Sequence, residues 1–189
     1  MIFETIVTTR GDGRTQIAPM GIREQDGRVV IAPFRPSATL DCLLRARCAV
    51  VNFTDDVRVF AGCMTGRYAW PTLPAQKVAC ERLADALAHA ELELERVEDD
   101  PLRPRLLFRE VARITHAPFR GFNRAQAAVI EAAILVSRLD MLPREKLDAE
   151  MEYLAIAISK TGGPRELEAW GWMKAAVDNH RAQSRETSA

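Results

Sequence analysis

The segment from Phe119 to Met141 most strongly limits what this chain can fold into, because a marked helix start runs into an almost uninterrupted apolar stretch. Asn123 followed by Gln126 has the spacing of a capping box, which satisfies unpaired N–H groups of the first helical turn. Residues 127–139 are apolar nearly all round, a pattern typical of a helix that is buried rather than lying on a surface. The sequence therefore predicts a capped, buried helix in the second half of the chain.

Two arginines flank this helix start and give it the features of an anion site. Arg120 and Arg124 lie on either side of Asn123, where unpaired N–H groups and the positive end of the helix dipole attract negative charge. A phosphate-bearing ligand is one partner that this pattern indicates. The other is a carboxylate across an interface between two copies, from Glu131 or from the acidic segment Glu91–Glu95.

Composition limits the classes of partner and compartment. The 189 residues suit one domain, or one domain with an extension. The 26 basic and 26 acidic side chains balance to a net charge of zero, which argues against nucleic-acid binding because such proteins carry a basic excess. No N-terminal segment has the pattern of a signal peptide, and the apolar run at 125–139 is too short to cross a bilayer. We therefore expect a cytoplasmic protein that does not span a membrane.

Neither a metal site nor a hydrolytic centre is expected from motifs. The cysteines form no C-x-x-C pair and are expected to be reduced, partly buried thiols; they are Cys42, Cys48, Cys63 and Cys80. The histidines lie in unrelated settings, which argues against zinc; they are His89, His116 and His180. The chain also lacks G-x-S-x-G, H-E-x-x-H, P-loop and helix-opening G-x-G-x-x-G motifs, so no catalytic residue is assigned.

Hydrophobic periodicity and turn signals predict that strands come first and helices last. The expected strands are Phe3–Thr8, Thr15–Ile22, Val29–Phe34, Cys48–Phe53, Leu92–Val97 and Arg105–His116. The expected helices are Ala38–Arg47, Ala75–Ala90, Asn123–Leu142, Pro143–Lys160 and Pro164–Ala182. The carboxylates within Glu91–Asp100 are interpreted as the solvated face of a strand. This order predicts an α+β protein with a largely antiparallel barrel or sheet.

Two N-terminal segments carry most of the remaining chemistry. In Ala18–Ile22, a proline removes one ladder donor and a glycine permits close approach to the backbone, so a flat heterocycle could lie there. A bulge at a barrel corner is the alternative. In Arg35–Thr39, a guanidinium, two hydroxyls and a helix start converge as a phosphate monoester requires. An ordinary cap formed by Ser37 is the alternative there.

These segments together resemble the flavin-reductase-like FMN-binding split barrel. The resemblance rests on the A-P-M-G strand, the R-P-S-A-T helix start and the strand that ends Val-Asn-Phe. The blocks Phe122–Ala125 and Lys160–Pro164 look like an uncharacterised branch found in methanogenic archaea and in bacteria with related one-carbon cofactors. The resemblance implies an antiparallel split β-barrel at 1–120, with inserted helices, and a C-terminal helical extension at 121–189. It also implies a homodimer with FMN near the dimer interface.

Specific residues follow from the resemblance by motif position. It implies phosphate contacts from Arg35, Ser37 and Thr39, and contacts to the flavin ring from the backbone segment that follows Pro19. That ring segment consists of Met20, Gly21 and Ile22. Asn52 is expected to contact the ring or the ribityl chain. Asn123 and Arg124 are expected either to complete the phosphate site or to hold the dimer.

The resemblance leaves three functions open. The leading hypothesis is an FMN-dependent oxidoreductase acting on a small soluble substrate, since the cofactor would then carry the hydride chemistry. The donor would be NAD(P)H, or a deazaflavin or pterin-type cofactor if the one-carbon association holds. The second is a flavin-binding carrier, sensor or assembly protein without turnover. The third is a structural homodimer that has lost its ligand.

Overall fold

Two compact units make up the chain. The computed structural model describes residues 1–186. One unit comprises residues 1–55 and 69–119, and the other comprises residues 56–68 and those from 120 onward. The chain therefore leaves the first unit after Asp55, returns to it at Ala69 and leaves it again after Phe119.

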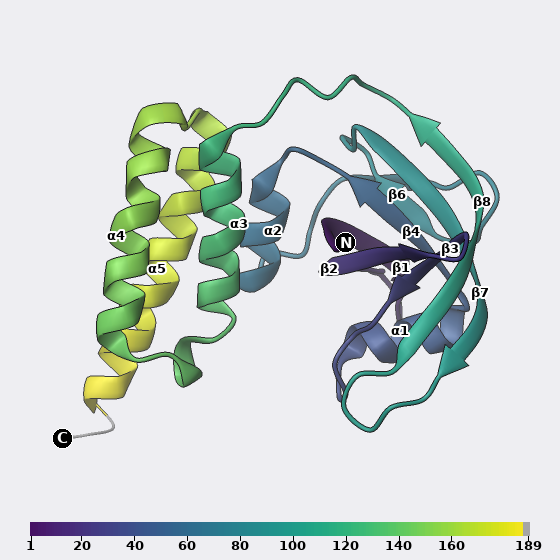
Figure 1. Ribbon diagram of the computed structural model, residues 1–189, viewed down its shortest axis with the longest axis horizontal. Helices are drawn as coiled ribbons and strands as arrows, with labels where there is room; N and C mark the ends of the chain where they lie inside the picture. The colour runs from purple at the N-terminus through teal and green to yellow at the C-terminus, as the bar shows by residue number, and fades with distance from the viewer. Residues whose placement is uncertain (187–189) are drawn as a thin grey trace. The chain divides into compact units, whose positions relative to one another are not determined.

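The first unit is a closed antiparallel barrel with the strand order β1-β2-β3-β8-β7-β4 (Figure 1). Its strands are β1 (Phe3–Arg10), β2 (Thr15–Gln25), β3 (Arg28–Ile31), β4 (Cys48–Phe53), β7 (Ala88–Glu98) and β8 (Arg105–Thr115). The tight turns of β1–β2 and β2–β3 place Gly13 and Gly27 at positive φ, where glycine has no steric cost. This architecture confirms the predicted α+β class and the antiparallel barrel.

Alternating apolar side chains from the strands fill the barrel. Ile22, Ile31, Leu92, Leu106 and Phe108 are each at most 1% exposed and belong to one core cluster. Helix α1 (Ala38–Ala46) adds Leu40 and Leu43 to the same cluster, at the lower end of the barrel in Figure 1. The α1 helix is thus fixed to the barrel by its buried face, which also fixes the loop that precedes it.

A short hairpin lies against the barrel between residues 71 and 84, where the sequence predicts a helix at Ala75–Ala90. That prediction is wrong. Strand β5 (Thr72–Pro74) pairs with β6 (Glu81–Leu83), and β7 already begins at Ala88. Backbone N–H groups of this segment bond to distant side chains: the Asn52 amide oxygen accepts from Leu83 and the Glu91 carboxylate accepts from residues 76–78. Tertiary hydrogen bonds have overridden a local helical pattern.

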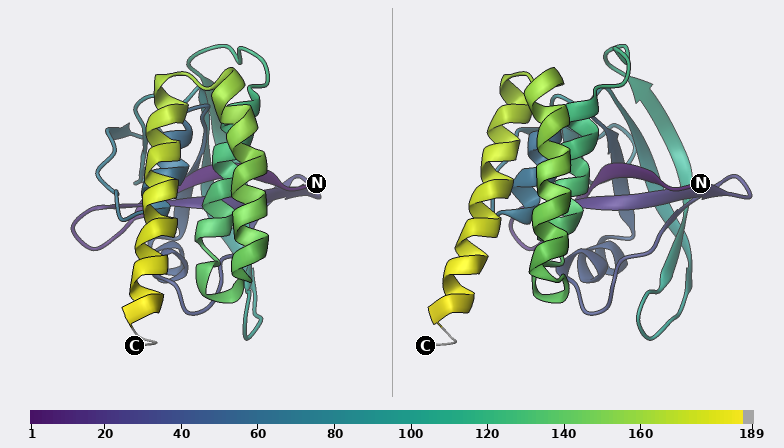
Figure 2. Two further views of the ribbon diagram at one scale, coloured as in Figure 1. Left: turned by 90° about the vertical axis from the view of Figure 1, so that its left-hand side faces the viewer. Right: turned by 60° about the vertical axis from the view of Figure 1, so that its left-hand side comes forward.

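The second unit is helical. It contains α2 (Val57–Met64), α3 (Arg124–Val136), the 3₁₀ turn η1 (Leu139–Met141), α4 (Arg144–Thr161) and α5 (Pro164–Glu186). Figure 2 shows α3, α4 and α5 running alongside one another. The core contains Val129, Ala132, Ala169 and Met173, all fully buried. The predicted burial of the apolar helix is confirmed, and its partners are the other helices of its own unit.

The sequence predicts that the helical extension begins near residue 120. The helical unit also includes the earlier segment 56–68, because α2 packs with the later helices. None of the helices within residues 1–186 has both the length and the hydropathy needed to cross a membrane.

Candidate functional site

An open backbone edge marks where the barrel is split. Residues Thr15–Ile22 of β2 pair with β1, but β3 pairs with β2 only from Ile22 to Gln25. Within residues 1–186, the outer edge of Thr15–Gly21 therefore has no strand partner. The chain after β3 returns to β2 at Thr39, whose hydroxyl oxygen accepts a hydrogen bond from the Gln16 side chain at 3.1 Å. We call this opening, bordered by residues 15–21 and 32–39, the barrel split.

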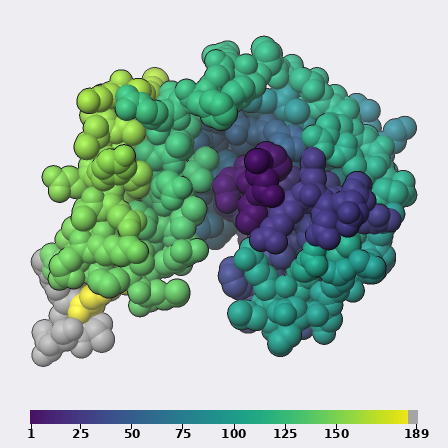
Figure 3. Space-filling model, in the orientation of Figure 1, coloured from purple at the N-terminus to yellow at the C-terminus, as the bar shows by residue number. Residues whose placement is uncertain are grey.

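The β2 border of the split presents mainly backbone. Ile22 is 1% exposed in the barrel core, and Met20 packs against the same core. Gly21 faces the other way, and a β-carbon there would come within 2.8 Å of the Ile2 side chain. The Ile2 side chain therefore lies over Gly21, and a ligand on this face of β2 would have to displace the exposed N-terminal segment, the darkest purple in Figure 3.

The opposite border carries the predicted phosphate residues. The exposed guanidinium of Arg35 forms an ion pair with Asp99 at 3.1 Å, and the Arg35 backbone N–H donates to the Leu102 carbonyl at 2.9 Å. Arg103 donates to the Ala32 carbonyl at 2.8 Å and lies over the Phe34 ring. The loop before α1 is thus held by the β7–β8 connection. An ion pair this exposed is weak, so an anionic ligand can displace Asp99.

The two hydroxyls of this border have structural partners. The Ser37 oxygen accepts from the Leu40 N–H at 3.2 Å, so Ser37 is the N-cap of α1. This is the ordinary cap expected from the sequence as the alternative to a phosphate contact. Thr39 is 6% exposed and accepts from Gln16. Contact of either hydroxyl with a phosphate stays a prediction.

Asn52 is fully buried and its amide is used within the barrel. Its nitrogen donates to the Ile6 carbonyl at 3.0 Å and to the Thr8 hydroxyl at 3.1 Å, and its oxygen accepts from the Leu83 N–H at 2.7 Å. The side chain ties β4 to β1 and to β6. A direct flavin contact by Asn52 would compete with these bonds, and such a contact stays a prediction.

Asn123 and Arg124 belong to the helical unit, not to the barrel. The Asn123 side chain caps α3, accepting from the Ala125 N–H at 2.8 Å and donating to the Thr161 carbonyl at 3.1 Å. Thr161 also accepts from Ala125. The predicted cap is confirmed, but the reciprocal capping box is wrong, because the Gln126 side chain donates to Glu166 instead. The side chain of Arg124 is exposed.

The side-chain bonds of Asn123 at the start of α3 should contribute to the stability of the protein. Replacing Asn123 by alanine removes the cap and the bond to Thr161, so we expect the free energy of unfolding to fall by about 1–2 kcal/mol. Urea denaturation measures this change. The matched control is Ser137→Ala at the other end of α3, where an exposed hydroxyl bonds only to the Ile134 carbonyl and a change within about 0.5 kcal/mol is expected. Equal losses in both variants would contradict the role of Asn123.

Sequence reasoning missed a buried polar chain in β7 and β8. Glu91 is fully buried, and His89 Nε2 lies 3.1 Å from its carboxylate. His89 Nδ1 lies 2.8 Å from Nε2 of the exposed His116. The solvated-face interpretation is therefore wrong for Glu91, and so is the view that the histidines lie in unrelated settings. No local signal identifies this chain, because His89 and His116 meet only through strand pairing.

The charge state of this chain follows from its hydrogen bonds. Burial opposes ionisation of Glu91, but the N–H groups of residues 76–78 and the His89 ring outweigh it and hold the carboxyl pKa below its ordinary value. An ionised carboxylate only accepts, so His89 Nε2 donates to it and His89 Nδ1 accepts from His116. Burial, and then the positive charge of Arg82, lower the His116 pKa.

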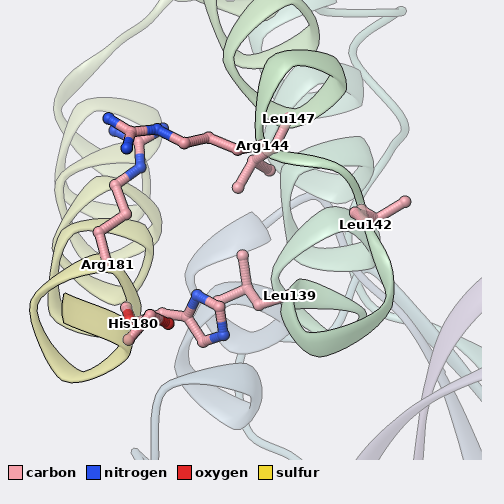
Figure 4. Close-up of a pocket in the computed structure, with 7 residues that line it drawn as sticks. Leu139, Leu142, Arg144, Leu147, His180 and Arg181 are labelled. Carbon is pink, nitrogen blue, oxygen red and sulfur yellow. Dashed lines mark hydrogen bonds between the residues drawn. The ribbon is translucent and has the colours of Figure 1, made fainter. Parts of the chain in front are cut away.

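A cavity of about 350 Å³ lies in the helical unit (Figure 4). Leu139, Leu142 and Leu147 line it, together with Arg144, His180 and Arg181, and the two guanidinium groups lie on the same side. Both arginines form ion pairs with Asp148, so their charge is already largely balanced. None of the residues predicted from the sequence lines this cavity.

Family models match most of the chain. The model described as the N-terminal domain of a protein of unknown function (DUF447) matches residues 3–117, and a second described as a protein of unknown function (DUF447) matches residues 123–175. The chain belongs to the DUF447 family. The break between the two matches falls at residues 118–122, beside the boundary expected near residue 120. No curated protein matches the chain.

Solved structures with similar coordinates show the fold. An FMN-bound DUF447 protein of Methanosarcina mazei matches 93% of this chain and 94% of its own length, with a TM-score of 0.80 at 20% identity. An FMN-binding protein of Thermus thermophilus matches 59% of this chain and 69% of its own length, with a TM-score of 0.50 at 22% identity. A flavoredoxin of Methanosarcina acetivorans matches 61% and 69%, with a TM-score of 0.52 at 11% identity. The DUF447 chain thus has the fold of the FMN-binding split barrels.

Proposed function

We propose that this DUF447 protein binds FMN at the barrel split. The observation that carries the proposal is that Ala18–Gly21 lies on the stretch of β2 that, among the described residues, has no second strand partner, and that Thr39 of the second motif bonds to Gln16 on the same stretch. Ile31, the last residue of β3, pairs with Ile22 and leads the chain into the loop that carries the second motif. The FMN bound to the Methanosarcina mazei family member supports the same ligand here.

Each border of the split would contribute differently. The Arg35 guanidinium would exchange Asp99 for the FMN phosphate, because a charge-assisted bond to a dianion is stronger than an exposed ion pair. Ser37 would present the start of α1 to the same group. The ring would lie against β2 at Gly21 in place of the Ile2 side chain, while the neighbouring Met20 and Ile22 side chains point into the barrel core.

The reaction class we infer is flavin-dependent oxidoreduction of a small substrate. Bound FMN would supply hydride transfer, while the chain supplies binding, orientation and charge. A structural relative from Streptomyces globisporus is an NADH:FAD oxidoreductase, which favours NAD(P)H as the donor. A deazaflavin or pterin-type donor stays an alternative, since no sequence feature selects among these donors. A screen of these donors under anaerobic conditions, followed at the flavin absorption bands, would identify the one that reduces the protein.

A spectroscopic test comes first. Purified protein mixed with FMN and freed of excess is expected to keep oxidised-flavin absorption bands with altered fine structure. Arg35→Gln is expected to weaken FMN binding about 10-fold to 100-fold, because the substitution removes one charge-assisted hydrogen bond. The control is Arg96→Gln, which removes another exposed arginine paired with a carboxylate, Glu98, and should leave affinity unchanged. A colourless protein that cannot be reconstituted would overturn the proposal.

The second candidate is a flavin carrier, sensor or assembly protein without turnover. Full FMN affinity without reduction by any of the donors would favour it.

We also propose that the protein forms a homodimer, which the exposed Phe119 and Phe122 side chains support. The Arg124→Gln variant separates the two roles predicted for Arg124. If the variant binds FMN more weakly while its mass in sedimentation is unchanged, Arg124 contacts the FMN phosphate. If the dimer dissociates instead, Arg124 belongs to the dimer interface.

A further inference from the structure

Two cysteines that are far apart in the sequence meet on the barrel unit. Cys48 Sγ at the start of β4 lies 2.8 Å from Cys80 Sγ, which precedes β6. Cys80 is 7% exposed and Cys48 is half-buried, and both are free thiols. The two sulfurs need to approach by less than 1 Å to reach the length of a disulfide, about 2.05 Å.

The backbones on both sides are anchored, so the two sulfurs are held together. The Thr9 hydroxyl donates to the Cys48 carbonyl at 2.7 Å. The Ala75 N–H donates to the Cys80 carbonyl at 3.0 Å, and the buried Glu91 carboxylate accepts from the N–H groups of residues 76–78 just before it. Cys80 is therefore fixed against Cys48 by bonds that do not involve either sulfur.

The two thiols differ in acidity, as an attacking and a resolving cysteine do. The hydrogen bond with Cys80, and then the positive charge of Arg10 and the Ala79 backbone, lower the pKa of Cys48 to about 7 against the effect of burial. The same hydrogen bond, with burial, raises the pKa of Cys80. Cys63 is a contrast, since burial alone raises its pKa to about 12. Of the two thiols, Cys48 is therefore the one whose ionisation is favoured.

A cationic cavity of about 540 Å³ adjoins Cys80. Arg10 and Arg14 line it, together with the turn glycines Gly11 and Gly13. Glu81 also lines it, but its carboxylate accepts hydrogen bonds from the Thr15 and Thr72 hydroxyls. The volume suits a small molecule, and the two guanidinium groups suit carboxylates.

We propose that Cys48 and Cys80 form a redox-active dithiol that reacts with an anionic low-molecular-weight disulfide. The cavity lined by Arg10, Arg14 and Cys80 would hold a carboxylate of this disulfide, and the disulfide sulfurs would reach past Cys80 to Cys48, which does not line the cavity. The Cys48 thiolate attacks one sulfur of the bound disulfide, and the other sulfur leaves as a thiolate. Cys80 then loses its proton and attacks Cys48 Sγ, which expels the second thiolate. The protein pair is oxidised to one disulfide, the small disulfide is reduced to two thiols, and the two protons pass to the products.

The test uses the full chain and two probes, glutathione disulfide with its carboxylates and the neutral 2-hydroxyethyl disulfide. Glutathione disulfide is expected to consume two thiols and to join the Cys48 and Cys80 peptides in a non-reducing digest. Cys80→Ser should stop at a mixed disulfide on Cys48, Cys48→Ser should form no such bond, and Cys42→Ser should react as the parent does. Absence of the Cys48–Cys80 disulfide in the parent chain overturns the proposal.

The anion site is tested by a ratio of rates. Arg10→Gln combined with Arg14→Gln is expected to lower the rate with glutathione disulfide, relative to the neutral probe, by about tenfold or more. The ratio cancels any change in the nucleophilicity of Cys48, to which Arg10 also contributes. The control pair is Arg96→Gln with Arg105→Gln, which removes two exposed arginines that both pair with Glu98. An unchanged ratio overturns the anion site.

Discussion

Glu91→Gln is expected to lower the free energy of unfolding by about 3 kcal/mol at pH 7, although it replaces one side chain by another of nearly the same size. The Glu91 carboxylate is fully buried and accepts from three backbone N–H groups at 2.6–3.1 Å and from His89. Glutamine offers one acceptor oxygen and turns an NH₂ group toward donors, so buried N–H groups lose their partner. Urea denaturation of both proteins measures the difference.

The effect of Glu91 should depend on pH with a definite sign. Its folded pKa is lowered, so its contribution to stability is complete above the ordinary value of 4.5 and is lost as pH falls through the folded pKa. The parent and the variant should therefore differ most at neutral pH and converge in acid. Glu93→Gln is the matched control on the same strand, because Glu93 is 47% exposed and pairs with Arg109, a contact worth at most about 1 kcal/mol. A loss of the same size in both variants would contradict a special role for Glu91.

Asn52→Asp is expected to lower the free energy of unfolding by about 3 kcal/mol at pH 7, and this loss should not depend on bound flavin. The substitution keeps the size of the side chain but replaces a donor by an oxygen that faces the Ile6 and Val50 carbonyls at 3.0 and 3.3 Å. Either a charge is buried without a partner or the carboxyl must hold a proton. Denaturation of the flavin-free protein isolates this effect from ligand binding.

Asn179→Asp serves as the control for Asn52, since Asn179 is an exposed position of α5 and a change within about 0.5 kcal/mol is expected. A stable Asn52→Asp protein with weakened FMN binding would restore the predicted flavin contact and contradict the structural role. A destabilised Asn52→Asp protein would support the structural role, in which the Asn52 side chain joins β4 to β1 and β6.

Local patterns in the sequence predicted most elements well. The apolar run Cys48–Phe53, predicted as a buried strand, corresponds to β4 at the same bounds, and the Asn123 cap begins α3 where expected. Ser37 also caps α1. These features depend on residues two to four positions apart, so the neighbouring sequence contains what is needed to recognise them.

The predictions that failed depended on contacts across long stretches of chain. The helical spacing of Ala75–Ala90 was misleading because Asn52 and Glu91, outside that segment, accept its N–H groups. Glu91 has the same sequence setting as its exposed neighbours Glu93 and Glu95, and only the packing of the 76–78 segment against it makes it buried. A composition pattern cannot distinguish these carboxylates.

By itself, the sequence determined most of the strands, the three C-terminal helices and the caps formed by Ser37 and Asn123. The tertiary structure alone showed that the Asn52 amide bonds to β1 and β6, that residues 72–83 form a hairpin, that α2 packs with the later helices, and that Cys48 meets Cys80. The physical reason is the range of the interactions. Periodicity and capping are set by neighbours along the chain, whereas strand register and buried polar contacts join residues that are tens of positions apart.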